Sequence, residues 1–126
     1  MSFAIIVPGG TLLEPAEIAR LASEVASDRQ ATDIVVLDVR VSCSFADYFV
    51  LATAESIRQL NAVWEAITDS LDALGVAPLH KEGTADSGWL LTDYGSVVIH
   101  LFAPEEREYY QLDSLWKDAV AILRMQ

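Results

Sequence analysis

The chain has 126 residues, of which 52% are hydrophobic and 21% are charged. This length and composition predict one domain with a single core, and they exclude both a disordered chain and two full domains. The formal net charge is −11, from 19 acidic and 8 basic side chains, so the surface repels a phosphate backbone and no direct, sequence-specific nucleic-acid binding is expected. An acidic surface suits a basic partner, although solubility alone also explains the charge.

The N-terminal segment and the cysteine content bear on location. The run Phe3–Val7 is apolar, but it has no basic residue before it and is too short for a signal peptide or a membrane span. The single cysteine, Cys43, cannot form an internal disulfide. We therefore expect a cytoplasmic protein without a membrane partner, in which residues 1–13 are an N-terminal extension and residues 14–126 are the domain.

The first half of the chain predicts a helix followed by two strands. Pro15 suits the first turn of a helix, and apolar residues then recur at helical spacing as far as Asp28. The β-branched run Ile34–Leu37 indicates a buried strand. Tyr48–Thr53 predicts the second strand, with Cys43 in the connection between the two.

A strongly signalled helix follows the second strand. Ser56 and Gln59 form a capping-box pattern, in which the Ser56 hydroxyl accepts from the Gln59 amide and the Gln59 side chain reaches back. Gly75 can adopt the left-handed conformation that ends the helix, and Pro78 prevents its continuation. The apolar stripe consists of Ile57, Leu60, Trp64, Ile67, Leu71 and Leu74.

The second half predicts three strands and a final helix. Leu79–Gly83 is a third strand, and Trp89–Thr92 and Val97–Phe102 form a hairpin, of which the last strand is apolar on both faces and therefore central. Pro104 ends it. A terminal helical segment would contain Leu112, Leu115, Trp116 and Val120. The fold class is α/β, a single compact domain with a mixed five-stranded sheet flanked by helices.

No recognisable catalytic set is present. His80 and His100 are separated by a turn and a strand, without a zinc-binding pattern, and Cys43 is more simply a packing residue than a nucleophile. Asp33 and Asp38 are five residues apart, so on one strand they point to opposite faces and cannot hold the magnesium ions of a nucleotidyltransferase. We expect no metal, no cofactor and no enzymatic activity.

Two aromatic residues in the hairpin are harder to assign to the core. Trp64 and Trp116 fall on helical apolar stripes, which predicts packing roles. Trp89 follows residues 86–88 at the edge of the hairpin, where burial is the commoner fate and an interface anchor is the alternative. Tyr94 lies in the turn itself, where a core position is less readily expected.

Ordered motifs over most of the chain resemble those of one family. They are Asp33–Val39, Ala46–Val50, Ser56, Arg58-Gln59, Glu82-Gly83, Trp89, Asp93-Tyr94-Gly95, Val98, His100-Leu101-Phe102, Arg107-Glu108, Tyr110, Leu112, Leu115-Trp116 and Asp118-Ala119. From about Pro15 to Ala119 the chain resembles the ribosomal silencing factor family, also called the Iojap-like family. No single motif is decisive, but the ordered set is specific.

The resemblance implies a nucleotidyltransferase-like fold without transferase activity, and a homodimer in many members. It also implies binding to the basic fourteenth protein of the large ribosomal subunit, on the intersubunit face, so that the small subunit cannot join and translation is repressed when nutrients are scarce. An acidic chain suits a basic ribosomal protein better than it suits ribosomal RNA. Two alternatives stay open: a nucleotide-binding or nucleotidyltransferase-type enzyme, and a purely structural dimer partner of another protein.

The positional match and the turn predict a docking patch. It consists of Trp89, Leu91, Asp93 and Tyr94, with the aromatic residues as anchors and Asp93 meeting a basic side chain. A second set, Asp47, His100 and Arg107, is predicted to be a polar cluster that fixes strand and loop geometry. His100 is expected to bond to a neighbour such as a carboxylate.

Overall fold

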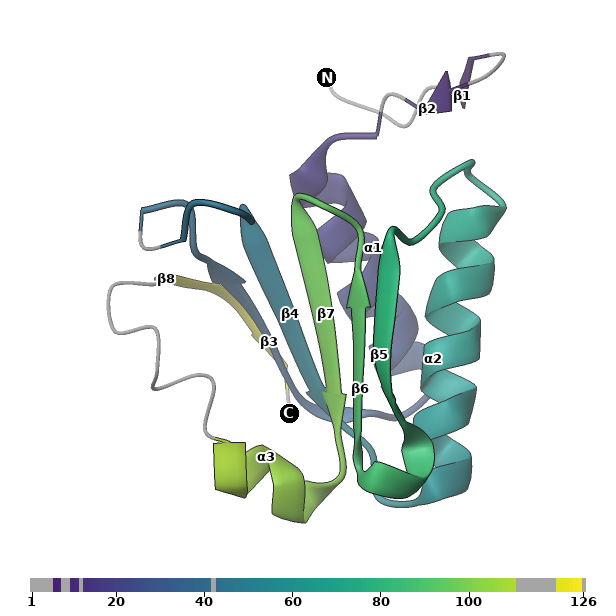
Figure 1. Ribbon diagram of the computed structural model, residues 1–126, viewed down its shortest axis with the longest axis vertical. Helices are drawn as coiled ribbons and strands as arrows, with labels where there is room; N and C mark the ends of the chain where they lie inside the picture. The colour runs from purple at the N-terminus through teal and green to yellow at the C-terminus, as the bar shows by residue number, and fades with distance from the viewer. Residues whose placement is uncertain (1–5, 8–9, 12, 42, 111–119, 126) are drawn as a thin grey trace.

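A six-stranded mixed sheet forms the centre of the computed structural model, which describes residues 6–7, 10–11, 13–41, 43–110 and 120–125 (Figure 1). The strands lie in the order β5-β6-β7-β4-β3-β8. Their bounds are β3 Thr32–Asp38, β4 Tyr48–Thr53, β5 His80–Thr84, β6 Trp89–Asp93, β7 Val97–Phe102 and β8 Val120–Met125. Two further short strands, β1 Ile6–Val7 and β2 Gly10–Thr11, pair only with each other.

The pairing confirms that the second strand of the hairpin is central. β7 lies between β6 and β4, and all six of its residues are buried. Its pairing with β4 is parallel, whereas the other neighbouring strands of the large sheet run antiparallel. A strand buried on both faces is expected to be apolar throughout, as Val97–Phe102 is except at His100.

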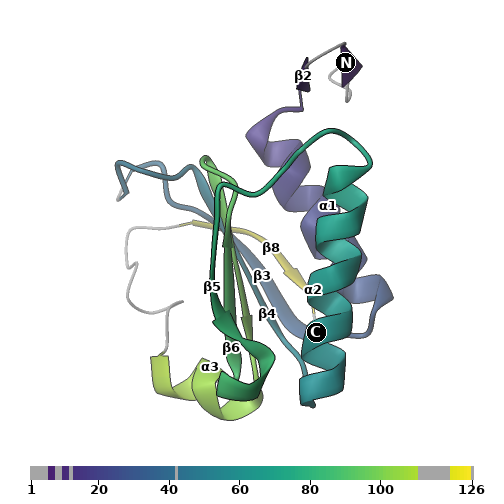
Figure 2. The same ribbon diagram turned by 45° about the vertical axis from the view of Figure 1, so that its right-hand side comes forward.

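Two long helices cover one face of the sheet. α1 Pro15–Asp28 and α2 Ile57–Asp72 lie side by side on that face, as the edge-on view shows (Figure 2). The predicted start of α1 at Pro15 is confirmed. A short helix, α3 Pro104–Tyr110, begins where β7 ends and lies at the end of the sheet (Figure 1). Among the described residues, no helix combines the length and apolar character needed to cross a membrane.

The ends of α2 follow from its sequence, with one difference. Ser56 Oγ accepts a hydrogen bond from the Gln59 backbone amide at 3.1 Å, as predicted. The Gln59 side chain reaches back one residue further than expected and accepts from the Glu55 amide at 2.7 Å. Its amide nitrogen also donates to the Gln30 carbonyl at 2.9 Å, which ties the start of α2 to the end of α1. Gly75 adopts a φ of 80°, as its predicted role requires.

The expected count of five strands is wrong because β8 adds a sixth. Val120 lies in this strand and not in the predicted terminal helix, while Leu112, Leu115 and Trp116 lie outside the described residues. β8 pairs antiparallel with β3 along its length. Pairing with an edge that is already in place outweighs the local helix preference of alanine, leucine and methionine, a case of tertiary context overriding propensity.

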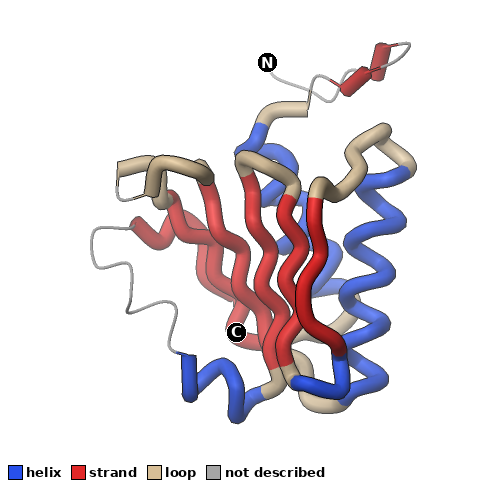
Figure 3. Tube along the Cα trace, in the orientation of Figure 1, coloured by secondary structure: helices blue, strands red, loops and turns tan. Residues whose placement is uncertain are grey.

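Alternation along the strands gives the sheet two different faces, seen with the helices behind it in Figure 3. The helix face packs against α1 and α2, and its strand residues are mostly aliphatic: Ile34, Val36, Val50, Ala52, Leu90, Val97, Ile99 and Leu101. We call the opposite side the aromatic face, after the rings of Phe49, Trp89, His100 and Phe102; it also carries Val35, Leu37, Leu51, Leu91 and Val98. Of the described helices, none lies over the middle of the aromatic face (Figure 2).

Candidate docking face

Strand register places three of the four predicted docking residues in one line. Residues opposite each other in paired strands project from the same side of a sheet. The pairs between β6 and β7 are Trp89 with Phe102, Leu91 with His100, and Asp93 with Val98. The outer strand β5 continues these rows with Thr84, Glu82 and His80. Trp89, Leu91 and Asp93 therefore lie together on the aromatic face, and each is half-buried.

A chain of ring contacts crosses the aromatic face. The Trp89 and His100 rings stack at 6.5 Å between centroids, with 12° between their planes. The Phe102 ring also stacks on the His100 ring, at 6.1 Å between centroids, and Phe49 meets His100 edge-on at 5.1 Å. Rings held by neighbouring rings lose little freedom when a partner covers them, so the half-buried Trp89 is a suitable rigid anchor.

His100 is an imidazole held in an apolar setting. It is 6% exposed, and neither ring nitrogen has a hydrogen-bond partner in the part of the chain that the structure describes. The expectation that it bonds to a carboxylate is therefore wrong. Burial lowers the pKa of His100 to about 4, and the positive charge of Arg107 acts in the same direction. The ring is neutral at pH 7 and packs as an aromatic residue.

Tyr94 does not belong to the aromatic face. It is 8% exposed and packs in the core of the helix face, because it continues the alternation that puts Leu90 on that face and Leu91 and Asp93 on the opposite one. Burial raises the pKa of Tyr94 to about 12, with the charge of Asp72 acting in the same direction. The expectation that this turn exposes an aromatic anchor is therefore wrong, and Tyr94 instead fixes the turn to the core.

Asp93 has one structural bond and a half-exposed position. Its Oδ1 accepts a hydrogen bond from the Gly95 amide at 2.7 Å, the local bond typical of an aspartate that opens a turn. The Tyr94 amide donates to the Val97 carbonyl at 2.9 Å and completes the turn. A carboxylate that accepts one bond retains capacity for a basic side chain from outside.

The structure divides the predicted polar cluster, because Arg107 acts electrostatically on His100 but lies at the other end of β4 from Asp47. Arg107 is 8% exposed and donates from Nη1 to Thr53 Oγ1 at 2.9 Å, which fastens α3 to the end of β4. Asp47 lies at the opposite end of β4, where its amide donates to the Ser96 carbonyl at 2.7 Å. The six residues of β4 separate Asp47 from Arg107, so Asp47 does not share a cluster with the other two.

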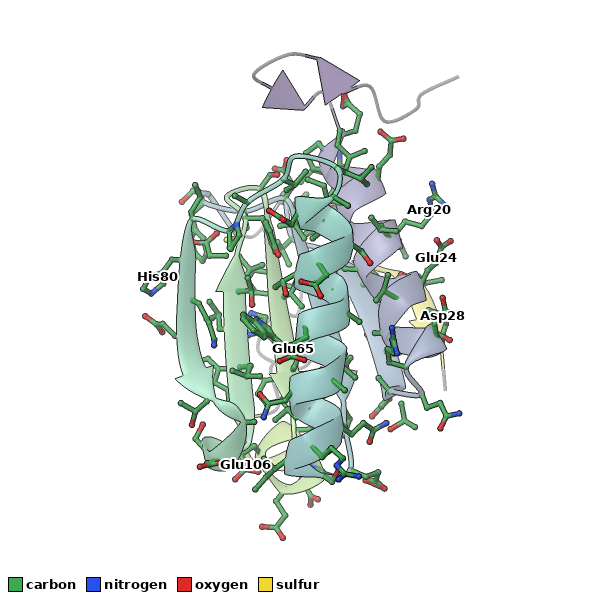
Figure 4. The ribbon with its side chains drawn as sticks, turned by 90° about the vertical axis from the view of Figure 1, so that its right-hand side faces the viewer. Arg20, Glu24, Asp28, Glu65, His80 and Glu106 are labelled. Atoms are coloured by element: carbon green, nitrogen blue, oxygen red, sulfur yellow. The ribbon has the colours of Figure 1, made fainter. Side chains whose placement is uncertain are left out.

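Acidic side chains flank the ring contacts on the hairpin side. Glu82 lies opposite Leu91 on the outer strand, and His80 lies opposite Asp93. Figure 4 shows His80 projecting outward from the edge of the sheet, away from α2. His80 Nε2 and Glu82 Oε2 are 2.8 Å apart, and both side chains are about half exposed, at 56% and 54%. Leu91 thus has the Glu82 carboxylate opposite it and Asp93 two residues along the strand, with Trp89 on its other side, an arrangement that favours a basic protein surface.

The described residues supply no set for metal or nucleophile chemistry. They contain no group of three or more His, Cys, Asp or Glu side chains that could hold a metal ion. Asp33 and Asp38 lie at opposite ends of β3, and Asp38 is bonded to Arg40 at 2.6 Å, which lowers the pKa of this carboxyl. Cys43 is buried, as its predicted packing role requires.

Comparison with known proteins identifies the family. The sequence model described as "Ribosomal silencing factor during starvation" matches residues 13–126. The chain belongs to the ribosomal silencing factor family. It is 37% identical to the ribosomal silencing factor of Bacillus subtilis over 81% of this chain and 86% of that protein. A solved structure from Chromobacterium violaceum matches with a TM-score of 0.79 and 35% identity, covering 82% of this chain and 87% of that one.

One relative is a eukaryotic protein whose name places it in mitochondria. The chain is 39% identical to a mouse protein named "Mitochondrial assembly of ribosomal large subunit protein 1", over 68% of this chain and 39% of that protein. The ribosomal silencing factor family is named for a regulatory action on the ribosome and not for a reaction. The chain is therefore a regulatory factor and not an enzyme.

Sequence reasoning missed several residues that build the aromatic face of this silencing-factor domain. Phe49 and Phe102 hold the His100 ring, yet both read as ordinary apolar strand residues. Phe45 contacts Phe49 from the loop before β4, at 6.4 Å between ring centroids. Two-residue alternation from Trp89 and His100 would have placed Phe49 and Phe102 on this face, once the order of the strands was known.

Proposed function

We propose that this protein binds the large ribosomal subunit and sterically blocks joining of the small subunit, so that translation is repressed when nutrients are limited. The partner on the large subunit is its basic fourteenth protein. The observation that carries the proposal is the aromatic face of a silencing-factor domain, where the half-buried Trp89 and Leu91 lie beside the carboxylates of Glu82 and Asp93. The net charge of −11 favours encounter with a basic protein over encounter with RNA.

The docking residues in this proposal are Trp89, Leu91 and Asp93. The Trp89 ring and the Leu91 side chain lose water to an apolar area of the partner, and Asp93 meets a basic side chain. Aromatic anchors beside a few charges are typical of the residues that dominate binding energy at interfaces. Tyr94, the fourth residue of the predicted patch, supports the turn from the core and does not contact the partner.

Steric exclusion requires no chemistry at the docking site. A bound domain only has to occupy the surface that the small subunit would cover. The name of the mouse relative, which mentions assembly of the large ribosomal subunit, supports the choice of subunit. A cytoplasmic location, a homodimer in the unbound state, and a domain of residues 14–126 after an extension of residues 1–13 belong to the same proposal.

The test is co-sedimentation with purified large subunits, followed by addition of excess small subunits. The wild-type protein is expected to sediment with large subunits and to reduce the yield of joined ribosomes. Trp89→Ala should weaken binding by roughly 2 kcal/mol or more, the loss typical of a central anchor. Circular dichroism and thermal melting establish that the variant is folded.

Two outcomes would contradict different parts of the proposal. Absence of wild-type binding would mean that the chain shares the family fold without this function. Unchanged binding of a folded Trp89→Ala variant would mean that the protein docks through another surface.

A further inference from the structure

The loop between β3 and β4 exposes two large apolar side chains. Val41 is 89% exposed and Phe45 is 67% exposed, which makes them the first and third most exposed of the large hydrophobic residues that the structure describes. Scattered exposed apolar residues need no explanation, but a pair on one loop beside a proposed docking surface does. Exposed apolar side chains at a loop tip lower solubility unless a partner covers them, so we ask which partner this loop would fit.

This loop is held in place at its base. Its buried side chains, Cys43 and Ala46, pack into the core cluster of the aromatic face. The Cys43 amide donates to the Val39 carbonyl at 2.8 Å, and the Val39 amide donates to the Asp47 carbonyl at 2.9 Å. The exposed side chains therefore project from a loop with a defined base, and a partner would not have to order that base on binding.

The Phe45 ring continues the ring contacts of the aromatic face. It meets Phe49 at 6.4 Å between centroids, and Phe49 in turn meets His100 at 5.1 Å, the ring on which Trp89 stacks. Phe49 and His100 are buried, whereas the two outer members, Phe45 and Trp89, are exposed and half-buried. The aromatic face thus has an accessible ring at each end of a buried pair.

The charges beside the loop suit the same kind of partner as the hairpin. Arg40, the basic residue next to Val41, is bonded to Asp38 at 2.6 Å and 2.9 Å, so its charge is largely compensated. Asp47 is half-buried at the base of the loop. The net charge of −11 favours a basic partner, and the ring contacts from Phe45 to Trp89 make this loop continuous with the surface proposed to bind one.

We propose that Phe45, with Val41 beside it, is a second anchor that enters an apolar depression on the same basic ribosomal protein that Trp89 contacts. This inference rests on the proposed function. It adds that the partner is engaged at two separate points, the hairpin on β6 and the loop before β4. A two-point contact fixes the orientation of the bound domain, which steric exclusion of the small subunit requires.

The experiment measures the dissociation constant for purified large subunits with Phe45→Ala, Val41→Ser and a matched control, Ile57→Ser. Ile57 is also exposed, at 53%, but it is the first residue of α2, the helix that covers the opposite face of the sheet (Figure 2). We expect about tenfold weaker binding for Phe45→Ala, a smaller loss for Val41→Ser, and no change for Ile57→Ser. Phe45→Leu, which keeps an apolar side chain, should fall between wild type and Phe45→Ala. The polar variant Phe45→Gln replaces Phe45→Ala if that variant fails to fold.

The outcomes separate this inference from the proposed function. If wild-type protein binds and Trp89→Ala weakens binding, but folded Phe45→Ala or Phe45→Gln binds within about twofold of wild type, the second anchor is wrong and the proposed function stands. If Phe45→Ala changes only the oligomeric state in sedimentation velocity, the loop serves self-association and the inference is overturned. If wild-type protein does not bind large subunits, the proposed function and the second anchor both fail.

Discussion

The helix face and the aromatic face are built from alternate residues of the same strands, yet they differ in kind. On β4, Val50 and Ala52 point to the helices, while Phe49 and Leu51 point the other way. The helix face is aliphatic and is covered by α1 and α2. The aromatic face carries stacked rings, a neutral buried histidine and half-buried hairpin residues.

The different side chains of the two faces indicate that the faces have different roles. Aliphatic side chains against helices give the area burial that stabilises a domain. The buried ring nitrogens of His100 have no hydrogen-bond partner among the described residues, and an unsatisfied buried polar group typically costs about 1–3 kcal/mol of stability. Such a residue is not explained by the needs of the core, which is consistent with a surface used for docking.

The largest expected effect is on the helix face. Leu71→Ala removes a side chain with 0% exposure that packs α2 against the core. We expect it to lower the free energy of unfolding by about 3 kcal/mol, measured by urea denaturation. Its affinity for large subunits, corrected for the folded fraction, should be unchanged. A loss of affinity in the folded protein would mean that the helix face takes part in docking.

The next effect is a pH dependence that comes from His100. Because burial lowers the folded-state pKa to about 4, the unfolded chain binds a proton near pH 6.5 while the folded chain does not. Stability is therefore lost as the pH falls from about 6.5 towards 4, by up to about 3 kcal/mol. His100→Phe should remove this loss. Asp38 acts separately, since its pKa is lowered by its bonds from Arg40 and its contribution is lost only at more acidic pH.

Denaturation at several pH values between 7 and 4.5 tests this. An equal loss of stability in wild type and His100→Phe would show that His100 does not titrate as its burial requires.

A smaller effect is expected for the charge of Asp93. Asp93→Asn keeps an oxygen for the Gly95 amide but removes the negative charge, so the turn should persist and stability should change by less than about 0.5 kcal/mol. Affinity for large subunits should fall several-fold at low salt, and the difference should shrink as salt increases. Asp93→Ala, which also removes the turn bond, is the comparison. A salt-independent loss would assign Asp93 to the turn alone.

The smallest effect is expected for Tyr94→Phe. The Tyr94 hydroxyl is buried and has no hydrogen-bond partner among the described residues. Removing it should leave unfolding free energy and large-subunit affinity within about 0.5 kcal/mol of wild type, because no bond is lost. Weaker binding with normal stability would return Tyr94 to the docking surface.

The sequence predicted those helices and strands well whose conformation depends on residues close by in the chain. Tyr48–Thr53 and the hairpin strands follow from β-branched and aromatic runs around a turn, and Ser56 caps α2 as its sequence predicts. β8 could not be predicted in this way, because its conformation depends on the edge of β3, which is about 85 residues earlier. Long-range pairing leaves little trace in the sequence of one strand.

The placement of the candidate site residues was likewise only partly predictable from the sequence. Alternation put Trp89, Leu91 and Asp93 on one side of β6, which the sequence could predict. The same alternation puts Tyr94 on the opposite side with Leu90, but its position in a turn favoured exposure over this signal. The separation of Asp47 from Arg107 depends on which end of β4 each one meets. Phe45 was missed because its contact with Phe49 exists only in the folded loop.

Two half-buried tryptophans on opposite sides of the sheet provide the most direct test of the division between the faces. Trp64 lies on α2, where its indole Nε1 donates to Thr92 at 2.9 Å on the helix face, whereas Trp89 lies on the aromatic face. The measurement is the dissociation constant for large ribosomal subunits of Trp64→Ala and Trp89→Ala, made where both are fully folded. Binding is expected to weaken tenfold or more for Trp89→Ala and to stay at the wild-type value for Trp64→Ala. Equal losses, or a loss for Trp64→Ala alone, would contradict the assignment of docking to the aromatic face.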